Sequence, residues 1–187
     1  MVNQERVEVE AGKQFRLVAA GKGFVGWVSK DFPQELFADL SRDPDGFFYA
    51  PASEILKSVP KAAVIRRAVK DGVGVGRSVI VKRFQPGSLL RRVGYLIFPS
   101  PARRCFRAAL LLKGASVETP APLGVLESRS WKSLGASYYI TEEITASHSL
   151  RALLLRILSD FPEKQARRLK FRLLEEASRL LYRLHSS

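Results

Sequence analysis

The order of the hydrophobic patterns along the chain limits the fold more than any other feature of the sequence. Alternating and β-branched segments predict strands, and apolar residues that repeat every three or four positions predict helices. The predicted strands lie at 14–30 (two short strands around a turn), 55–56, 62–69, 78–84, 124–127 and 137–144, and the predicted helices at 33–40, 101–112, 149–158 and 162–185. Loop chemistry occupies 41–46. About five strands with one helix, followed by a helical region, predict an α+β protein.

The chain carries a strong and unevenly distributed positive charge. Its net charge is +13, and the stretch between Gly72 and Val117 holds nine lysines and arginines but no acidic residue. A field of one sign attracts polyanions such as nucleic acids, phosphates or an anionic membrane surface. A basic face that is merely solvated is the alternative explanation.

The composition excludes several classes of protein. Hydrophobic residues make up 46% of the chain and charged residues 26%, which is typical of a globular protein. No apolar run approaches the ~20 residues of a membrane span, and the first residues do not resemble a signal peptide. Cys105 is the single cysteine, and His148 and His185 lie far apart, so we expect neither a disulfide nor a metal site. We therefore expect a cytoplasmic protein.

Lys82 ends a segment, Val79-Ile80-Val81-Lys82, that has the apolar pattern of a buried strand. Apolar neighbours hold the stem of such a lysine, and its ammonium group suits phosphate oxygens. In kinases the third strand places a lysine on the phosphates of ATP. Lys82 is therefore the candidate for positioning a phosphate in catalysis.

Four segments, taken in this order, resemble the lipopolysaccharide kinase family, which includes the Kdo and heptose kinases of the inner core. They are 79–84, the arginine-rich segment from Leu89 to Arg104, 117–122 and 138–143. The resemblance extends over about residues 52–187 and depends on the order and spacing of the segments rather than on a single motif.

The resemblance implies a protein-kinase-like fold in three parts. Residues 1–51 form an extension packed on the lobe that follows, 52–144 form the small lobe, and 145–187 begin a helical large lobe. The implied activity is phosphate transfer from ATP, with Mg²⁺, to a sugar of a lipid-anchored acceptor. The catalytic base and the metal ligands of such kinases follow the helix that ends near His185, so we expect them beyond residue 187 and expect no activity from this chain alone.

The resemblance also implies where a nucleotide binds. The chain passes between the lobes at four residues whose backbone N–H and C=O groups are expected to bind adenine: Thr141, Glu142, Glu143 and Ile144. The best placed phosphate loop lies between the first two strands of the small lobe, where Lys57, Ser58 and Lys61 are the expected ligands together with Lys82. The glycines at 21, 23 and 26 fit the kinase pattern G-x-G-x-x-G-x-V, but they lie too far before Lys82, and we interpret them as a tight turn.

Cys105 departs from the kinase pattern. Kinases pair the strand lysine with a glutamate on the following helix, and Cys105 occupies the matching position. Lys82 then needs another anion, binds phosphate alone or serves an inactive site. A pseudokinase or adaptor with the same fold therefore stays open, as does a basic nucleic-acid-binding protein, although no nucleic-acid-binding motif favours the latter.

The segment from Leu89 to Arg104 mixes arginines with large apolar residues. Such a segment is suited to lie on an anionic inner membrane surface and to gather a phosphorylated glycolipid acceptor. A packed helix with solvated arginines is equally consistent with the pattern. Peripheral membrane association is thus a hypothesis that rests on exposure of the apolar residues.

Overall fold

The computed structural model describes residues 14–20, 23–70, 76–130, 133–144 and 150–186. The chain divides into two compact units. Unit 1 comprises Met1–Leu111 and Pro120–Glu143, and unit 2 comprises Leu112–Thr119 and Ile144–Ser187.

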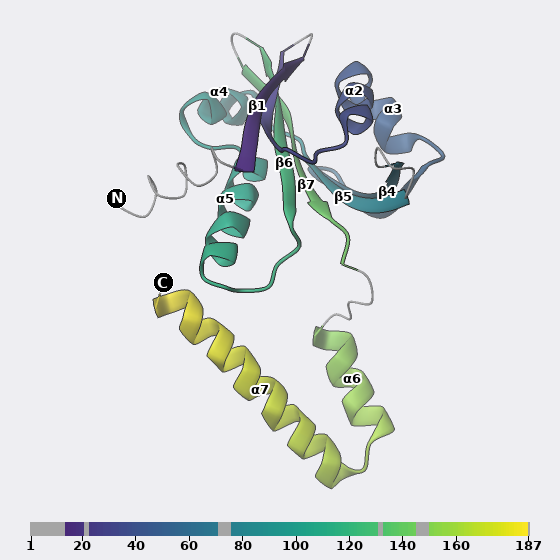
Figure 1. Cartoon of the computed structure of the whole chain (residues 1–187), viewed down its shortest axis with the longest axis vertical. Helices are drawn as coiled ribbons and strands as arrows, with labels where there is room; N and C mark the ends of the chain where they lie inside the picture. Colours follow the sequence, from purple (N-terminus) through teal and green to yellow (C-terminus); the bar gives the residue numbers. More distant parts are fainter. Residues whose placement is uncertain (1–13, 21–22, 71–75, 131–132, 145–149, 187) are drawn as a thin grey trace. The chain divides into compact units, whose positions relative to one another are not determined.

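Unit 1 is built on one antiparallel sheet. Its strands are β1 (Phe15–Ala20), β2 (Phe24–Ser29), β3 (Ser53–Val59), β4 (Ala62–Lys70), β5 (Gly76–Phe84), β6 (Pro122–Ser130) and β7 (Ser133–Glu142), in the order β1-β2-β6-β7-β5-β4-β3 (Figure 1). The predicted α+β class is confirmed, but the prediction of about five strands in this sheet is wrong. The hairpin of β1 and β2 extends the sheet because Phe24 to Val28 pair with Ser128 to Gly124 of β6.

Four helices belong mainly to this unit: α2 (Gln34–Arg42), α3 (Pro44–Tyr49), α4 (Leu89–Ile97) and α5 (Pro101–Gly114). Ser100 caps the start of α5, and its hydroxyl accepts from the Arg103 N–H at 3.1 Å. The predicted loop at 41–46 is wrong, because the same residue types begin a helix. Asp43 caps α3 by accepting from the Gly46 N–H at 3.0 Å, and Pro44 occupies the first turn.

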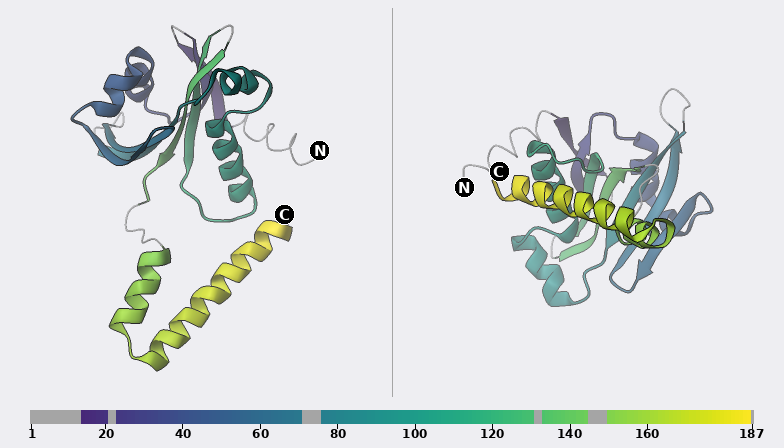
Figure 2. Two further views of the ribbon diagram at one scale, coloured as in Figure 1. Left: turned by 180° about the vertical axis from the view of Figure 1, so that it is seen from behind. Right: turned by 90° about the horizontal axis from the view of Figure 1, so that it is seen from below.

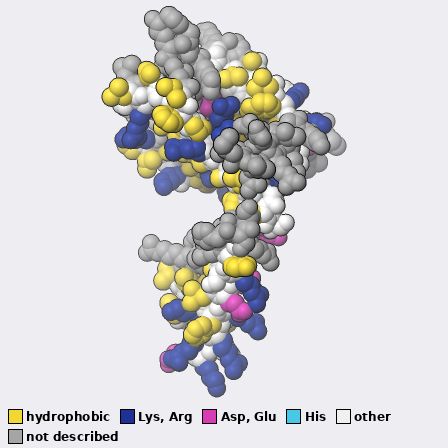
Figure 3. All heavy atoms as spheres, turned by 90° about the vertical axis from the view of Figure 1, so that its left-hand side faces the viewer, with side chains coloured by type: hydrophobic (Ala, Val, Ile, Leu, Met, Phe, Trp, Pro, Cys, Tyr) yellow, Lys and Arg dark blue, Asp and Glu magenta, His cyan; other side chains and the backbone are white. Residues whose placement is uncertain are grey.

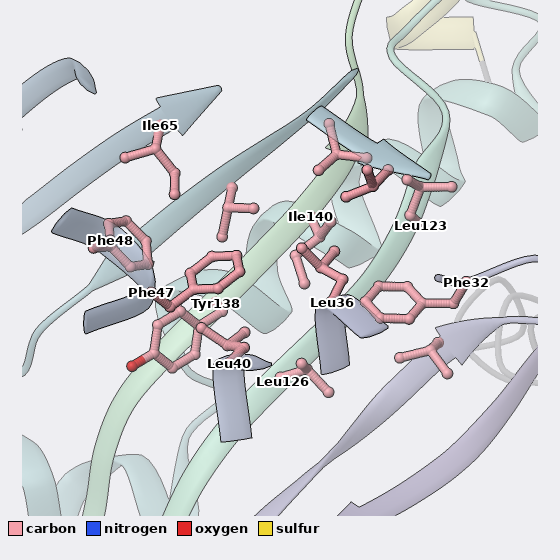
Figure 4. Close-up of a cluster of buried hydrophobic side chains, with 14 of the residues drawn as sticks. Phe32, Leu36, Leu40, Phe47, Phe48, Ile65, Leu123, Leu126, Tyr138 and Ile140 are labelled. Carbon is pink, nitrogen blue, oxygen red and sulfur yellow. The ribbon is translucent and has the colours of Figure 1, made fainter. Parts of the chain in front are cut away.

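One face of the sheet is closed by α2 and α3. Leu36, Leu40 and Phe48 are at most 2% exposed and pack against strand residues such as Ile140. In Figure 4 the ring of Tyr138 lies among the side chains of these helices. Arg83 on the same face is 6% exposed, forms an ion pair with Asp45 of α3 at 2.6 Å, and lies 4.5 Å from the centre of the Phe48 ring. The N-terminal helices therefore complete the larger core.

The opposite face is covered by α5 (Figure 2). Ala102, Phe106 and Ala109 of this helix pack against Tyr139 and other strand residues. Phe15 and Phe106 meet edge to face, with ring centres 4.9 Å apart. Since the two cores lie on different faces, alternate residues along β5 and β7 belong to different environments. Val81 and Tyr138 face α2 and α3, whereas Lys82 and Tyr139 face the side of α5.

Unit 2 contains two helices, α6 (Leu150–Asp160) and α7 (Glu163–Ser186). Ile157 and Ala166 are buried between them, each 6% exposed. Within α7, Arg167 pairs with Glu163 at 3.0 Å and Arg179 pairs with Glu175 at 2.7 Å. Among the helices of the described part of the chain, none has the length and apolar character needed to cross a membrane.

Gly26 offers a test of the way in which β2 joins the sheet. A Cβ atom at this position would lie 2.0 Å from the Val125 carbonyl oxygen. We expect Gly26→Ala to lower the free energy of unfolding by about 3 kcal/mol, the upper end of ordinary overpacking. Urea denaturation measures the change. Gly94→Ala is the control, because a Cβ there meets nothing within 4 Å, and we expect it to stabilise α4 by about 0.5–1 kcal/mol. Equal stability of wild type and Gly26→Ala would contradict the close pairing of β2 with β6.

Candidate functional site

Lys82 lies in the centre of the sheet, on the face that α5 covers. It is opposite Tyr139 of β7 on one side and Val64 of β4 on the other. The side chain is half-buried, and its Nζ atom lies 5.8 Å from the centre of the Tyr139 ring. The ammonium group is therefore held against a central strand rather than free in solvent.

Lys57 shares this face of the sheet with Lys82. Because residues directly opposite one another point to the same side of an antiparallel sheet, the register Lys57–Val64–Lys82 places both lysines in one row. Two strand spacings separate their Cα atoms, roughly 10 Å. Lys57 is exposed and Lys82 half-buried, so the row presents two cations around Val64.

The predicted loop of Lys57, Ser58 and Lys61 is only partly a loop. β3 continues to Val59 and β4 begins at Ala62, which leaves a tight turn. Strand alternation then sends Ser58 to the face opposite that of Lys57. Lys61 lies at the turn, where its carbonyl accepts from the Gln85 N–H at 3.0 Å and its side chain lies against Gly87. The structure therefore brings Lys57 to Lys82, and does not bring Ser58 to them.

No carboxylate pairs with Lys82 within the described ranges. Cys105 of α5 packs in the core that contains Tyr139. Burial, and then the neighbouring Cys105, raise the pKa of the Tyr139 hydroxyl to about 12, so the phenol stays neutral at physiological pH. The ammonium group thus has an aromatic ring beside it but no anion.

Thr141, Glu142 and Glu143 lie at the end of β7 and just after it, in unit 1, whereas Ile144 belongs to unit 2. The N–H groups of Glu142 and Glu143 already donate to the carbonyls of Ala121 and Ser78, at 3.0 and 3.1 Å. Thr141 is 3% exposed. The backbone amides of Glu142 and Glu143 therefore donate within the sheet and are not available as donors for an adenine edge.

The side chains of both glutamates are also fixed. Glu142 pairs with Arg77 at 3.3 Å, and Glu143 pairs with Arg66 of β4 at 2.6 Å. Arg66 also pairs with Glu54 of β3 at 2.8 Å. Hydrogen bonds from Glu54, then from Glu143, raise the pKa of the Arg66 guanidinium above its usual value.

The sequence analysis missed the role of Arg66. The available signal was strand alternation in β4, which places Arg66 on the same face as Val64 and hence beside the lysine row. Its pairing with Glu54 and Glu143 ties β3 and β4 to the end of β7 on that face.

The glycine-rich pattern near the N-terminus is explained by the hairpin of β1 and β2. Gly23 has a φ of 88°, a conformation that favours glycine in the turn. Gly26 lies where β2 approaches β6 too closely for a Cβ atom. Gly21 and the glycine-rich turn at 71–75 lie outside the described residues. The interpretation of the pattern as a turn is confirmed for Gly23.

The residues of this face fit a phosphate better than a metal ion. Lys82 and Lys57 supply cations with no carboxylate between them. Across the described ranges, no group of three or more His, Cys, Asp or Glu residues is arranged to hold a metal ion. We therefore assign no metal ligand within these residues.

The central strand β5 carries the lysine, β7 pairs beside it, and α5 lies against the same face of the sheet. The structure is indeed similar to that of WaaP, solved in complex with acyl carrier protein, with a TM-score of 0.54 and 23% identity over 80% of this chain and 54% of that chain. The likeness shows a kinase-like fold, and the predicted resemblance is confirmed at this level. The present chain spans about half the length of the WaaP chain.

Other comparisons add no argument. Human STARD10 aligns with a TM-score of 0.19 and 12% identity over 97% of this chain and 77% of that chain, which is too low to indicate a shared fold. No protein-family model matches the chain, and no curated protein matches its sequence.

The buried tyrosines predict an alkaline loss of stability. Burial raises the pKa of Tyr138 and of Tyr139 to about 12, whereas the usual pKa of a tyrosine, which applies in the unfolded chain, is 10.0. The folded state keeps these protons longer, so their stabilising contribution is complete below pH 10 and is lost as the pH rises from about 10 to 12. We expect the free energy of unfolding to fall by about 2–3 kcal/mol per tyrosine over this interval.

Urea denaturation at several alkaline pH values measures this loss, and absorbance at 295 nm follows ionisation. Tyr139→Phe should reduce the pH dependence by about half. Tyr49→Phe, at a side chain 64% exposed, is the control for removal of a hydroxyl group. Ionisation of all tyrosines in a single step near pH 10 would contradict the burial of Tyr138 and Tyr139.

Proposed function

We propose that this chain is the ATP-binding portion of a kinase whose acceptor is a sugar of the lipopolysaccharide inner core. The observation that carries the proposal is the position of Lys82, half-buried on the helix-covered face of β5 and opposite Tyr139 of β7. The fold similarity to WaaP supports a kinase-related role. The identity of the acceptor follows from the resemblance described above.

In this proposal the two lysines bind and orient the triphosphate. Lys82 neutralises phosphate oxygens from the centre of the sheet, and Lys57 does so from the exposed end of the same row. The adenine is read by backbone groups at the end of β7 near Thr141, other than the Glu142 and Glu143 amides, which donate within the sheet. Mg²⁺ bound with the nucleotide supplies charge neutralisation at the phosphates. Neither Lys57 nor Lys82 serves as the catalytic base or as a metal ligand in this proposal.

The cellular setting follows from the acceptor. A lipid-anchored sugar on the cytoplasmic face of the inner membrane requires a cytoplasmic enzyme that reaches the membrane surface. WaaP was solved with acyl carrier protein, and a carrier protein is accordingly a second kind of partner to test.

A pseudokinase or adaptor is the second candidate function. It is favoured by one observation, namely that Lys82 pairs with no carboxylate in the described part of the chain. An ion pair with a helix glutamate is in place in active protein kinases. A measurement of nucleotide binding distinguishes the kinase from an adaptor that does not bind ATP.

We expect MgATP to stabilise the chain through Lys82. At a concentration of 100 times Kd the ligand adds about 2.7 kcal/mol, which for a chain of this size raises the melting temperature by about 5–10 °C. Differential scanning fluorimetry measures the shift. Lys82→Ala should abolish it, whereas Lys30→Ala, at an exposed lysine of the turn after β2, should keep it. No shift in the wild-type chain would favour the adaptor over the kinase.

The register of the sheet yields a finer test. Lys57→Ala should weaken MgATP binding about tenfold, because it removes one charge-assisted hydrogen bond to phosphate. Ser58→Ala should leave the affinity unchanged, since Ser58 lies on the opposite face. Isothermal titration calorimetry of both variants measures the difference. An equal effect of the two substitutions would mean that 57–61 binds phosphate as a flexible loop rather than through the Lys57–Lys82 row.

A further inference from the structure

The helix α4 exposes a stripe of large apolar side chains. Leu90 is 87% exposed, Val93 48% and Ile97 81%, and Phe98 at the end of the helix is 68% exposed. Leu90, Val93 and Ile97 are spaced by three and four residues, so they lie on one face of the helix. The helix itself contacts β7. An exposed apolar ridge of this kind on an otherwise charged protein marks an interaction site.

Basic residues flank this ridge. Arg91 and Arg92 on α4 and Arg104 on α5 are exposed, and within the described ranges none of them pairs with an acidic side chain. No acidic residue occurs from Gly72 to Val117. Figure 3 views the side of the molecule on which α4 and α5 lie, and hydrophobic and basic side chains are interspersed over it. The surface therefore combines apolar groups with uncompensated positive charge.

We propose that α4 docks the chain on an anionic lipid surface, lying in the interfacial plane with Leu90, Val93 and Ile97 among the acyl chains. Arg91, Arg92 and Arg104 then bind lipid phosphates. A helix with one apolar face and basic flanks binds membranes in this way, through buried apolar area and electrostatic attraction together.

The geometry favours a lipid surface over a folded partner. The apolar side chains project from a convex helix, and two of them are more than four-fifths exposed. A fluid acyl layer accommodates a protruding ridge, whereas a protein partner would need a matching groove. The helix is fixed at both ends, since Ser88 caps its first turn at 3.4 Å and the Phe98 N–H donates to the Gly94 carbonyl at 2.8 Å. It is therefore formed before it meets a membrane.

The choice of lipid rests in part on the proposed function, because a lipid-anchored acceptor places the enzyme at such a surface. The vesicle experiment omits nucleotide, so that its outcome does not depend on the MgATP experiment. Vesicle binding then reports only on α4, and the MgATP thermal shift reports only on the site around Lys82. Either can fail without the other.

The experiment is co-sedimentation of the full 187-residue chain with two kinds of vesicle, phosphatidylcholine alone and phosphatidylcholine with 30% phosphatidylglycerol. We expect binding to the anionic vesicles and little to the neutral ones. The double variant Leu90→Ser/Ile97→Ser should weaken binding more than tenfold, because each substitution removes the favourable free energy of transferring a large apolar side chain from water into the acyl layer. Arg91→Glu/Arg92→Glu should weaken it at least about fivefold for each arginine lost.

Matched controls change the same residue types elsewhere. Leu17→Ser alters a side chain 60% exposed on β1, and Arg16→Glu/Arg42→Glu makes the same change in net charge at exposed positions. Both should keep vesicle binding, and circular dichroism should be unchanged in all variants. Equal and negligible sedimentation with both kinds of vesicle would overturn the proposal. So would equal losses in the controls, or binding of purified acyl carrier protein that depends on Leu90 and Ile97 while vesicles are not bound.

Discussion

The pairing of β5 with β7 is the interaction on which the rest of the structure depends. These two strands lie in the middle of the sheet, and each contributes side chains to both cores. Because they are distant in sequence, closing the chain between them costs entropy that local contacts do not offset. Burial of Val81 and Ile140 on one face and Tyr139 on the other stabilises the pair. The same pairing places Lys82 opposite Tyr139, so the contact that stabilises the sheet also forms the candidate site.

The two faces of the sheet are covered in different ways, and this difference creates the site. On one face, α2 and α3 bury even Arg83, which finds an ion pair and an aromatic ring. On the other, α5 covers Tyr139 and Val125 but leaves Lys82 half-buried and Lys57 exposed. A cation at the border of a covered region is weakly solvated and still reachable, so its interaction with an incoming anion is stronger than in bulk water.

The sequence predicted the elements that local patterns determine, including β4, β5 and α5. It did not predict the pairing of β2 with β6, because strand order depends on contacts between distant segments. The helix α3 was missed since Asp43 and Pro44 are typical both of loops and of helix starts. The site was predicted in part. The strand pattern alone was enough to predict Lys82. That Lys57 and Ser58 lie on opposite faces could be seen only once the end of β3 was known. The role of Arg66 depends on its partners in other strands, which the sequence does not reveal.

In the proposed kinase, Cys105 stands where the kinase pattern predicts a helix glutamate, and this changes the electrostatics of the site more than its shape. Where a lysine and a helix glutamate form an ion pair, the position of the helix controls the phosphate ligand. Here Ala102, Phe106 and Ala109 pack α5 against the sheet. Tyr139 stays neutral, with a pKa of about 12, and offers Lys82 only the face of its ring. Within the described residues no carboxylate pairs with Lys82, which in the proposed function favours phosphate binding and removes the coupling between helix and nucleotide.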